Sequence, residues 1–225
     1  MMRANTSAKV SAARAVAAIW GVLAGFGGLV HGVGEALQGN VNPEGIIINS
    51  WKQGPIAAHM GGEPGMTIVP NLLITGTLTI VVALTIVVWA AAFVQRKHGG
   101  RILILLSVGM LLVGGGFAPP LVGILAGWAG TGINSPLKWW RARLSVSLRR
   151  FLARLWPWLS GACLIASLVL FVGSLIMVSV FDYSNANFFS MLFLFTFALL
   201  ILVVVTAFAR DAETNGPWPI TTESQ

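Results

Sequence analysis

The strongest constraint on the fold of this chain is a set of four long segments that carry almost no charge. A helix that crosses a bilayer needs roughly 20 mostly apolar residues in succession. The four segments reach or exceed that length, at residues 15–37, 67–94, 156–180 and 188–209. The sequence therefore predicts an all-α integral membrane protein, built as a polytopic helical bundle.

Composition supports this fold class. Charged residues make up 9% of the 225 residues and hydrophobic residues 56%, whereas soluble domains carry about 25% charged residues. The formal net charge of +7 is interpreted as basic residues held on the cytoplasmic side of a membrane, and we expect no nucleic-acid partner. The single cysteine, Cys163, excludes a disulfide within the chain.

Residues 101–133 are too long for one ordinary span and short for two. Their middle reads GGGFAPP, at residues 114–120. Proline removes a backbone donor and clashes with the preceding helical turn, and glycine weakens a helix further. The sequence predicts a hairpin of two short helices, at 102–116 and 120–133. The hairpin either crosses the bilayer fully or enters and leaves it on one side.

The placement of basic residues favours the hairpin. With it there are six membrane segments, both termini share one side, and Lys52 alone lies on the other side, a split of 13 to 1. With a single span at 101–133, the split would be 6 to 8. Positive charge collects on the cytoplasmic side of membrane proteins, so we expect a multi-pass protein of the cell membrane with both termini cytoplasmic. The thirteen residues are Arg3, Lys9, Arg14, Arg96, Lys97, Arg101, Lys138, Arg141, Arg143, Arg149, Arg150, Arg154 and Arg210.

These segments divide the chain into a cytoplasmic segment at 1–14, one transmembrane domain at 15–209 and a disordered cytoplasmic tail at 210–225. An outer loop covers 38–66. Residues 137–155 alternate apolar and arginine positions at helical spacing, which predicts a cytoplasmic amphipathic helix in the membrane interface. Its basic residues, within 138–154, are expected to contact anionic lipid headgroups. The helix is either an anchor that fixes topology or a regulatory, lipid-sensing segment.

A repeated pentapeptide is the main candidate for chemistry. HGVGE at 31–35 and HMGGE at 59–63 share the pattern His-x-x-Gly-Glu and use two of the three histidines. Imidazole and carboxylate groups are ligands of zinc and iron, so His31, Glu35, His59 and Glu63 are candidate ligands for Zn or Fe. The alternative is a hydrogen-bonded helix-end pair, His31–Glu35, beside solvated loop residues.

Two further patterns lie on the first two apolar segments. Thr67, Asn71, Thr75 and Thr79 recur every four residues; Asn71 and Thr75 join His31 and Glu35 as candidate ligand-binding residues, with packing as the alternative. A stripe of small residues predicts close helix packing on the first segment. It consists of Gly21, Gly25, Gly28 and Gly32.

Three functional classes remain. The leading hypothesis is a small transporter or sensor with an outward-facing polar or metal-binding site near His31 and Glu35. The second is a non-catalytic membrane subunit or scaffold that packs partner helices, or further copies of itself, through its glycine faces. The third is a membrane-embedded enzyme that uses the His and Glu groups as acid–base groups or metal ligands. We assign no catalytic residues, since phosphate-loop, GxSxG, HExxH and SxxK motifs are missing from the sequence.

Overall fold

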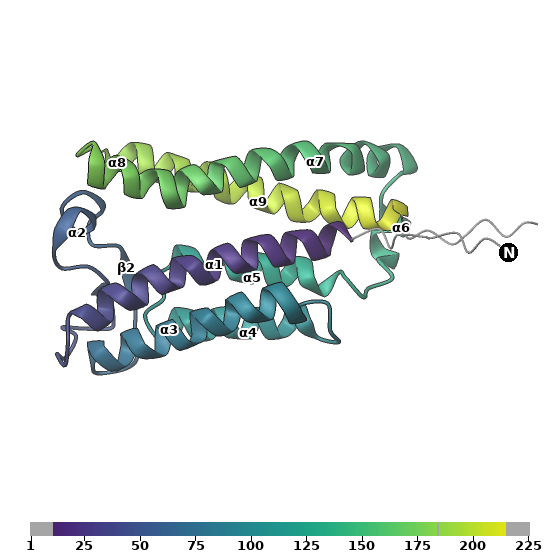
Figure 1. Cartoon of the computed structure of the whole chain (residues 1–225). Coiled ribbons are helices and arrows are strands. Elements are labelled where there is room, and N and C mark those ends of the chain that lie inside the picture. The colour runs from purple at the N-terminus through teal and green to yellow at the C-terminus, as the bar shows by residue number, and fades with distance from the viewer. Residues whose placement is uncertain (1–10, 184, 215–225) are drawn as a thin grey trace, which may run out of the picture.

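The computed structural model describes residues 11–183 and 185–214, and within them the chain forms an elongated bundle of helices (Figure 1). Four helices are long and apolar enough to cross a membrane, at Ala12–Leu37, Leu72–Phe93, Val146–Val180 and Ala186–Thr214. The elements in order are α1 (Ala12–Leu37), β1 (Ile47–Asn49), α2 (Gly54–Met60), β2 (Pro64–Met66), α3 (Leu72–Val88) with a π-helical turn η1 (Trp89–Phe93), α4 (Gly99–Leu112), α5 (Ala118–Thr131), α6 (Lys138–Arg143), α7 (Val146–Leu168) with a π-helical turn η2 (Val169–Gly173), α8 (Ser174–Val180) and α9 (Ala186–Thr214).

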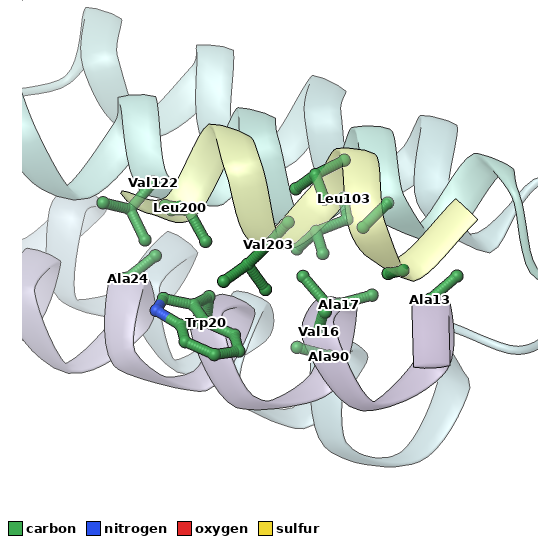
Figure 2. Close-up of a cluster of buried hydrophobic side chains, with 14 of the residues drawn as sticks. Ala13, Val16, Ala17, Trp20, Ala24, Ala90, Leu103, Val122, Leu200 and Val203 are labelled. Atoms are coloured by element: carbon green, nitrogen blue, oxygen red, sulfur yellow. The ribbon is translucent and has the colours of Figure 1, made fainter. Parts of the chain in front are cut away.

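Helix α1 lies at the centre of the bundle. On one side it packs against α3 and α5, and on the other it meets α9, which pairs with α7 (Figure 1). The core between these helices contains Val16 and Trp20 of α1, Leu103 of α4 and Val203 of α9 (Figure 2). Small side chains such as Ala13, Ala17 and Ala24 occupy the same face of α1, so its neighbours approach closely.

The two ends of the bundle differ in character. One end, which we term the loop end, carries residues 38–71 and the turn at 113–117 between α4 and α5. The other, the basic end, carries the start of α1, helix α6, the start of α7 and the end of α9 (Figure 1). Within the described residues, the chain passes between these two ends six times.

The predicted hairpin at 101–133 is present as α4 and α5. Each helix has 14 residues and is about 21 Å long, which is shorter than the roughly 30 Å of a hydrocarbon core. The turn between them reaches the loop end, where the amide of Ile68 donates to the carbonyl of Leu112 at 3.1 Å. Thr67 and Val113 form an isolated antiparallel bridge at the same place.

The basic segment at 137–155 is not the one separate amphipathic helix that the sequence predicts. The structure divides it into α6 and the first turns of α7, with a break at Leu144 and Ser145. The Ser145 hydroxyl accepts from the amide of Leu148 at 3.3 Å, so it caps a new helix. Because α7 then continues through η2 into α8, the arginine-bearing turns belong to a 35-residue helix.

The predicted start of the disordered tail, at residue 210, is also wrong. Helix α9 continues to Thr214, because residues 210–213 make specific contacts at the basic end. Asp211 accepts from the amides of Ala12 and Ala13, at 2.8 and 2.9 Å, and from the hydroxyl of Ser11 at 2.6 Å. Residues 1–10 and 215–225, which include most of the predicted N-terminal segment and the rest of the tail, lie outside the described residues.

The glycine stripe of α1 packs within the chain, as the spacing predicts. A Cβ on Gly25 would lie 2.5 Å from Cγ2 of Val87 and 2.9 Å from the carbonyl oxygen of Ala83, both in α3. A Cβ on Gly32 would lie 2.9 Å from Cγ1 of Ile80. The other two stripe positions are filled in the same way, Gly21 by Ala90 and Gly28 by Met110. This face of α1 is therefore occupied by the protein's own helices.

We expect Gly25→Ala to lower the free energy of unfolding by about 1–3 kcal/mol, because the added methyl group overlaps α3. Unfolding of the detergent-solubilised protein, followed by circular dichroism, measures this change. Gly161→Ala in α7 is the matched control, since a Cβ there meets nothing within 4 Å. Alanine favours helix over glycine, so the control should be neutral or slightly stabilising. Equal destabilisation by both substitutions would contradict the close-packing role.

Candidate functional site: a buried polar cluster at the loop end

Helix α1 supplies the two most deeply placed ionisable groups of the site. His31 is 5% exposed and Glu35 is 0% exposed. They lie one turn apart on the same side of the helix, close to its C-terminal end at Leu37. Burying such groups is costly unless polar partners surround them, so the partners define the site.

The loop between α1 and α3 supplies two of these partners, Ser50 and Glu63. Strands β1 and β2 pair antiparallel, and the pairing continues beyond them, with the Ser50 amide donating to the Glu63 carbonyl at 3.2 Å. The side-chain amide of Gln38 donates to the carbonyl of Ser50 at 2.9 Å, which fixes the loop to the end of α1. Glu63 has φ of 49°, a left-handed conformation that residues other than glycine seldom adopt.

The side chains form one connected network, which we call the polar cluster: His31, Glu35, Ser50, Glu63 and Thr79. His31 Nε2 lies 3.0 Å from Glu63 Oε2, and His31 Nδ1 lies 2.8 Å from Ser50 Oγ. Ser50 donates to Glu35 Oε1 at 3.0 Å. Thr79 lies 3.3 Å from Glu35 Oε2. The network thus runs from Glu63, whose side chain is 25% exposed, to the fully buried Glu35.

The turn between α4 and α5 closes the cluster from the other side. Gly114 and Gly116 have φ of 111° and 72°, conformations that glycine adopts without strain. A Cβ on Gly114 would overlap Oε2 of Glu35, and a Cβ on Gly116 would overlap the ring of His31. The GGGF part of the segment therefore forms a tight turn, the following Ala-Pro-Pro begins α5, and the glycines let the backbone lie directly against both ionisable groups.

Hydrogen positions follow from counting donors in the cluster. Ser50 has one hydroxyl hydrogen, and where it goes to Glu35, the tautomer of His31 that carries a proton on Nδ1 completes the contact between His31 and Ser50. Nε2 of His31 then shares one proton with Glu63, either as an imidazolium facing a carboxylate or as a neutral imidazole facing a carboxylic acid. In this tautomer, loss of that proton would leave two lone pairs opposed at 3.0 Å.

At Thr79 there are more hydrogen-bond acceptors than donors. Its hydroxyl lies within hydrogen-bond distance of Glu35 Oε2 and also of the Val113 carbonyl oxygen, at 3.3 and 2.5 Å. One hydroxyl hydrogen cannot serve both acceptors fully. A proton on Glu35 would donate to Thr79 and leave the Thr79 hydrogen for Val113. The cluster therefore has two positions, His31–Glu63 and Glu35, at which a bound proton completes the hydrogen bonding.

The two pentapeptides meet only in part. His31 of the first copy pairs with Glu63 of the second, and Glu35 joins them through Ser50. His59 lies in the last turn of α2 and points elsewhere, with Nε2 at 2.7 Å from Oδ1 of Asp182. Among the residues that the structure describes, no group of three or more His, Cys, Asp or Glu side chains is placed to hold a metal ion. The four predicted Zn or Fe ligands thus do not surround one point, because the second copy is divided between a helix and a turn.

The polar residues that recur every four positions on the second apolar segment also separate in the structure. They are Thr67, Asn71, Thr75 and Thr79. The α-helix begins only at Leu72, where the side chain of Asn71 caps it by accepting from the amide of Ile74 at 3.0 Å. The side chain of Asn71 also donates to that of Asn40. Within the described residues, Asn71 has no hydrogen bond to the polar cluster. Thr75 is buried against Gly114 and pairs with Thr67, hydroxyl to hydroxyl, at 3.0 Å. Thr75 thus lies beside the cluster, whereas Asn71 stabilises the start of α3.

Ser50 and Thr79 are the two residues of the polar cluster that the sequence did not single out as candidate ligands. Ser50 stands in an ordinary loop sequence, NSWK, and nothing in its neighbourhood marks it. Thr79 belongs to the four-residue repeat and is the member that reaches Glu35. Comparison of the chain with protein-family models, curated proteins and solved structures gives no significant match.

Proposed function

We propose that this chain is an integral membrane protein that senses protons at its loop end. In this arrangement six segments enter the bilayer and the basic end faces the cytoplasm. The distribution of Lys and Arg supports this orientation, because these residues concentrate on the cytoplasmic side of membrane proteins. The loop end, with the polar cluster, then faces outward, where the external pH can reach Glu63.

One observation supports the proton as the ligand: the His31–Glu63 contact needs one shared proton. That contact also fixes the loop, since Glu63 lies next to β2 and pairs through its backbone with Ser50. The charged groups that face His31 are Glu63 across the contact and Glu35 through Ser50. When the shared proton leaves, we expect the contact to become repulsive and the loop to separate from α1.

A second candidate function, proton transfer, follows from the continuity of the network. Glu63, His31, Ser50 and Glu35 form an unbroken sequence of groups that can accept and donate protons, as proton-conducting membrane proteins require. The glycine stripe of α1 packs against the chain's own helices, so this face is not free to pack a partner helix.

The test is hydrogen exchange of the loop peptide at 51–63, in protein reconstituted in lipid nanodiscs and corrected for the intrinsic pH dependence of exchange. As the pH rises from roughly 5 to 8, we expect protection of this peptide to fall about tenfold. That change corresponds to one lost hydrogen bond. Glu63→Gln should remove the pH dependence, because an amide can donate to a neutral imidazole and accept from a charged one.

Glu44→Gln is the matched control. Glu44 lies in the same loop, with a side chain that is 93% exposed and 3.8 Å from Lys52, so its removal should leave the pH response intact. A wild-type peptide whose protection does not change with pH would contradict the sensing proposal. Proton flux into liposomes, measured with an internal dye, separates the two candidates: flux that Glu35→Gln abolishes would favour transfer over sensing.

A further inference from the structure

The basic end contains a pocket that the polar cluster does not involve. A cavity of about 310 Å³ lies between α7 and α9. Its walls are formed by Arg150, Ala153 and Arg154 of α7 and by Arg210, Glu213 and Thr214 of α9. Three guanidinium groups and one carboxylate give the lining a formal charge of +2, as three positive charges less one negative.

The arginines of the pocket come from two helices, and Arg210 packs on a tryptophan ring. Arg150 and Arg154 stand four residues apart, so they lie on the same face of α7. The guanidinium of Arg210 stacks on the ring of Trp156, 4.7 Å from its centroid. Glu213 pairs with Arg149, which lies outside the pocket lining, and lies 3.9 Å from Arg150. Because Arg149 shares the charge of Glu213, the pocket keeps an excess of positive charge.

We propose that this pocket binds the phosphate group of an anionic phosphate ester, and that an anionic glycerophospholipid of the surrounding membrane supplies it. Guanidinium groups donate paired hydrogen bonds that match phosphate oxygens. The volume is at the lower limit of small-molecule sites, which suits a headgroup. Helix α7 also exposes large apolar side chains: Phe151 is 57% exposed and Trp158 is 79% exposed. Acyl chains of the lipid can cover these side chains.

The test is native mass spectrometry of the full chain in detergent, titrated with phosphatidylglycerol, with phosphatidylcholine and with glycerol 3-phosphate. We expect the wild type to retain phosphatidylglycerol in preference to phosphatidylcholine. Arg150→Gln/Arg154→Gln should weaken phosphatidylglycerol binding roughly thirtyfold, given the usual contribution of an arginine near anionic lipid. Both arginines are exposed, so this variant should fold. Arg210→Gln is a second variant that probes the same pocket from α9.

Arg101→Gln/Arg143→Gln is the charge-matched control, since both residues are exposed, lie at the basic end and do not line the pocket. Phosphatidylglycerol binding by this control should differ from that of the wild type by less than threefold. Equal weakening by both double variants would mean that overall surface charge attracts the lipid, and would overturn the proposal. Binding of glycerol 3-phosphate with the same arginine dependence would support the site and assign it a soluble phosphate. Binding of neither probe by the wild type would also overturn it.

Discussion

Gly116→Ala should lower the free energy of unfolding by about 3 kcal/mol and disrupt the polar cluster. Two effects add. The φ of 72° at this position costs an L-residue about 1–2 kcal/mol. The new methyl group also overlaps the imidazole of His31, and overpacking of this kind costs about 1–3 kcal/mol. Unfolding in detergent gives the stability, and exchange of the 51–63 peptide reports the cluster.

The overlap with His31 can be separated from the backbone strain by a double-mutant cycle. In a His31→Ala background the ring is gone, so alanine at 116 should cost only the conformational part, about 1–2 kcal/mol. Gly109→Ala is the helix control, because a Cβ there meets nothing within 4 Å. If Gly116→Ala costs the same with and without the imidazole, the turn does not pack on His31 as described.

Asp211→Ala should destabilise the protein by about 3 kcal/mol, measured by the same unfolding assay. The Asp211 carboxylate accepts from two amides at the start of α1 and from the hydroxyl of Ser11. Caps of this type contribute about 0.5–2 kcal/mol, and unpaired buried donors add to the cost of removing them. The carboxylate also lies at the positive end of the dipole of α1.

Two further substitutions serve as comparisons for Asp211→Ala. Asp211→Asn keeps one acceptor oxygen but loses the charge, so its cost should be intermediate. Glu44→Ala removes a carboxylate whose side chain is 93% exposed, and should change stability by less than about 0.5 kcal/mol. A small effect of Asp211→Ala, similar to that of Glu44→Ala, would show that the end of α9 does not hold the start of α1.

The sequence predicted the helical bundle because hydrophobic length is a local property. Four long apolar segments and the break at GGGFAPP appear in the structure as helices and as a turn. The glycine stripe of α1 was predictable for the same reason, since spacing along a helix decides which residues share a face. The boundaries at 137–155 and 210–214 were not predictable, because a cap by Ser145 and the contacts of Asp211 and Glu213 decided them.

The candidate site was predicted in part. His31 and Glu35 were recognisable as ionisable residues at the end of an apolar helix, and Glu63 as part of a repeated pattern. The pattern could not show that His59 pairs with Asp182, far along the chain, while Ser50 joins His31 to Glu35. Those contacts depend on how the loop pairs its strands and where it packs on α1. The sequence by itself determined which groups must be buried in a bundle of apolar helices, and only the tertiary structure decided their partners, because a buried polar group is satisfied by whichever donors and acceptors the fold places beside it.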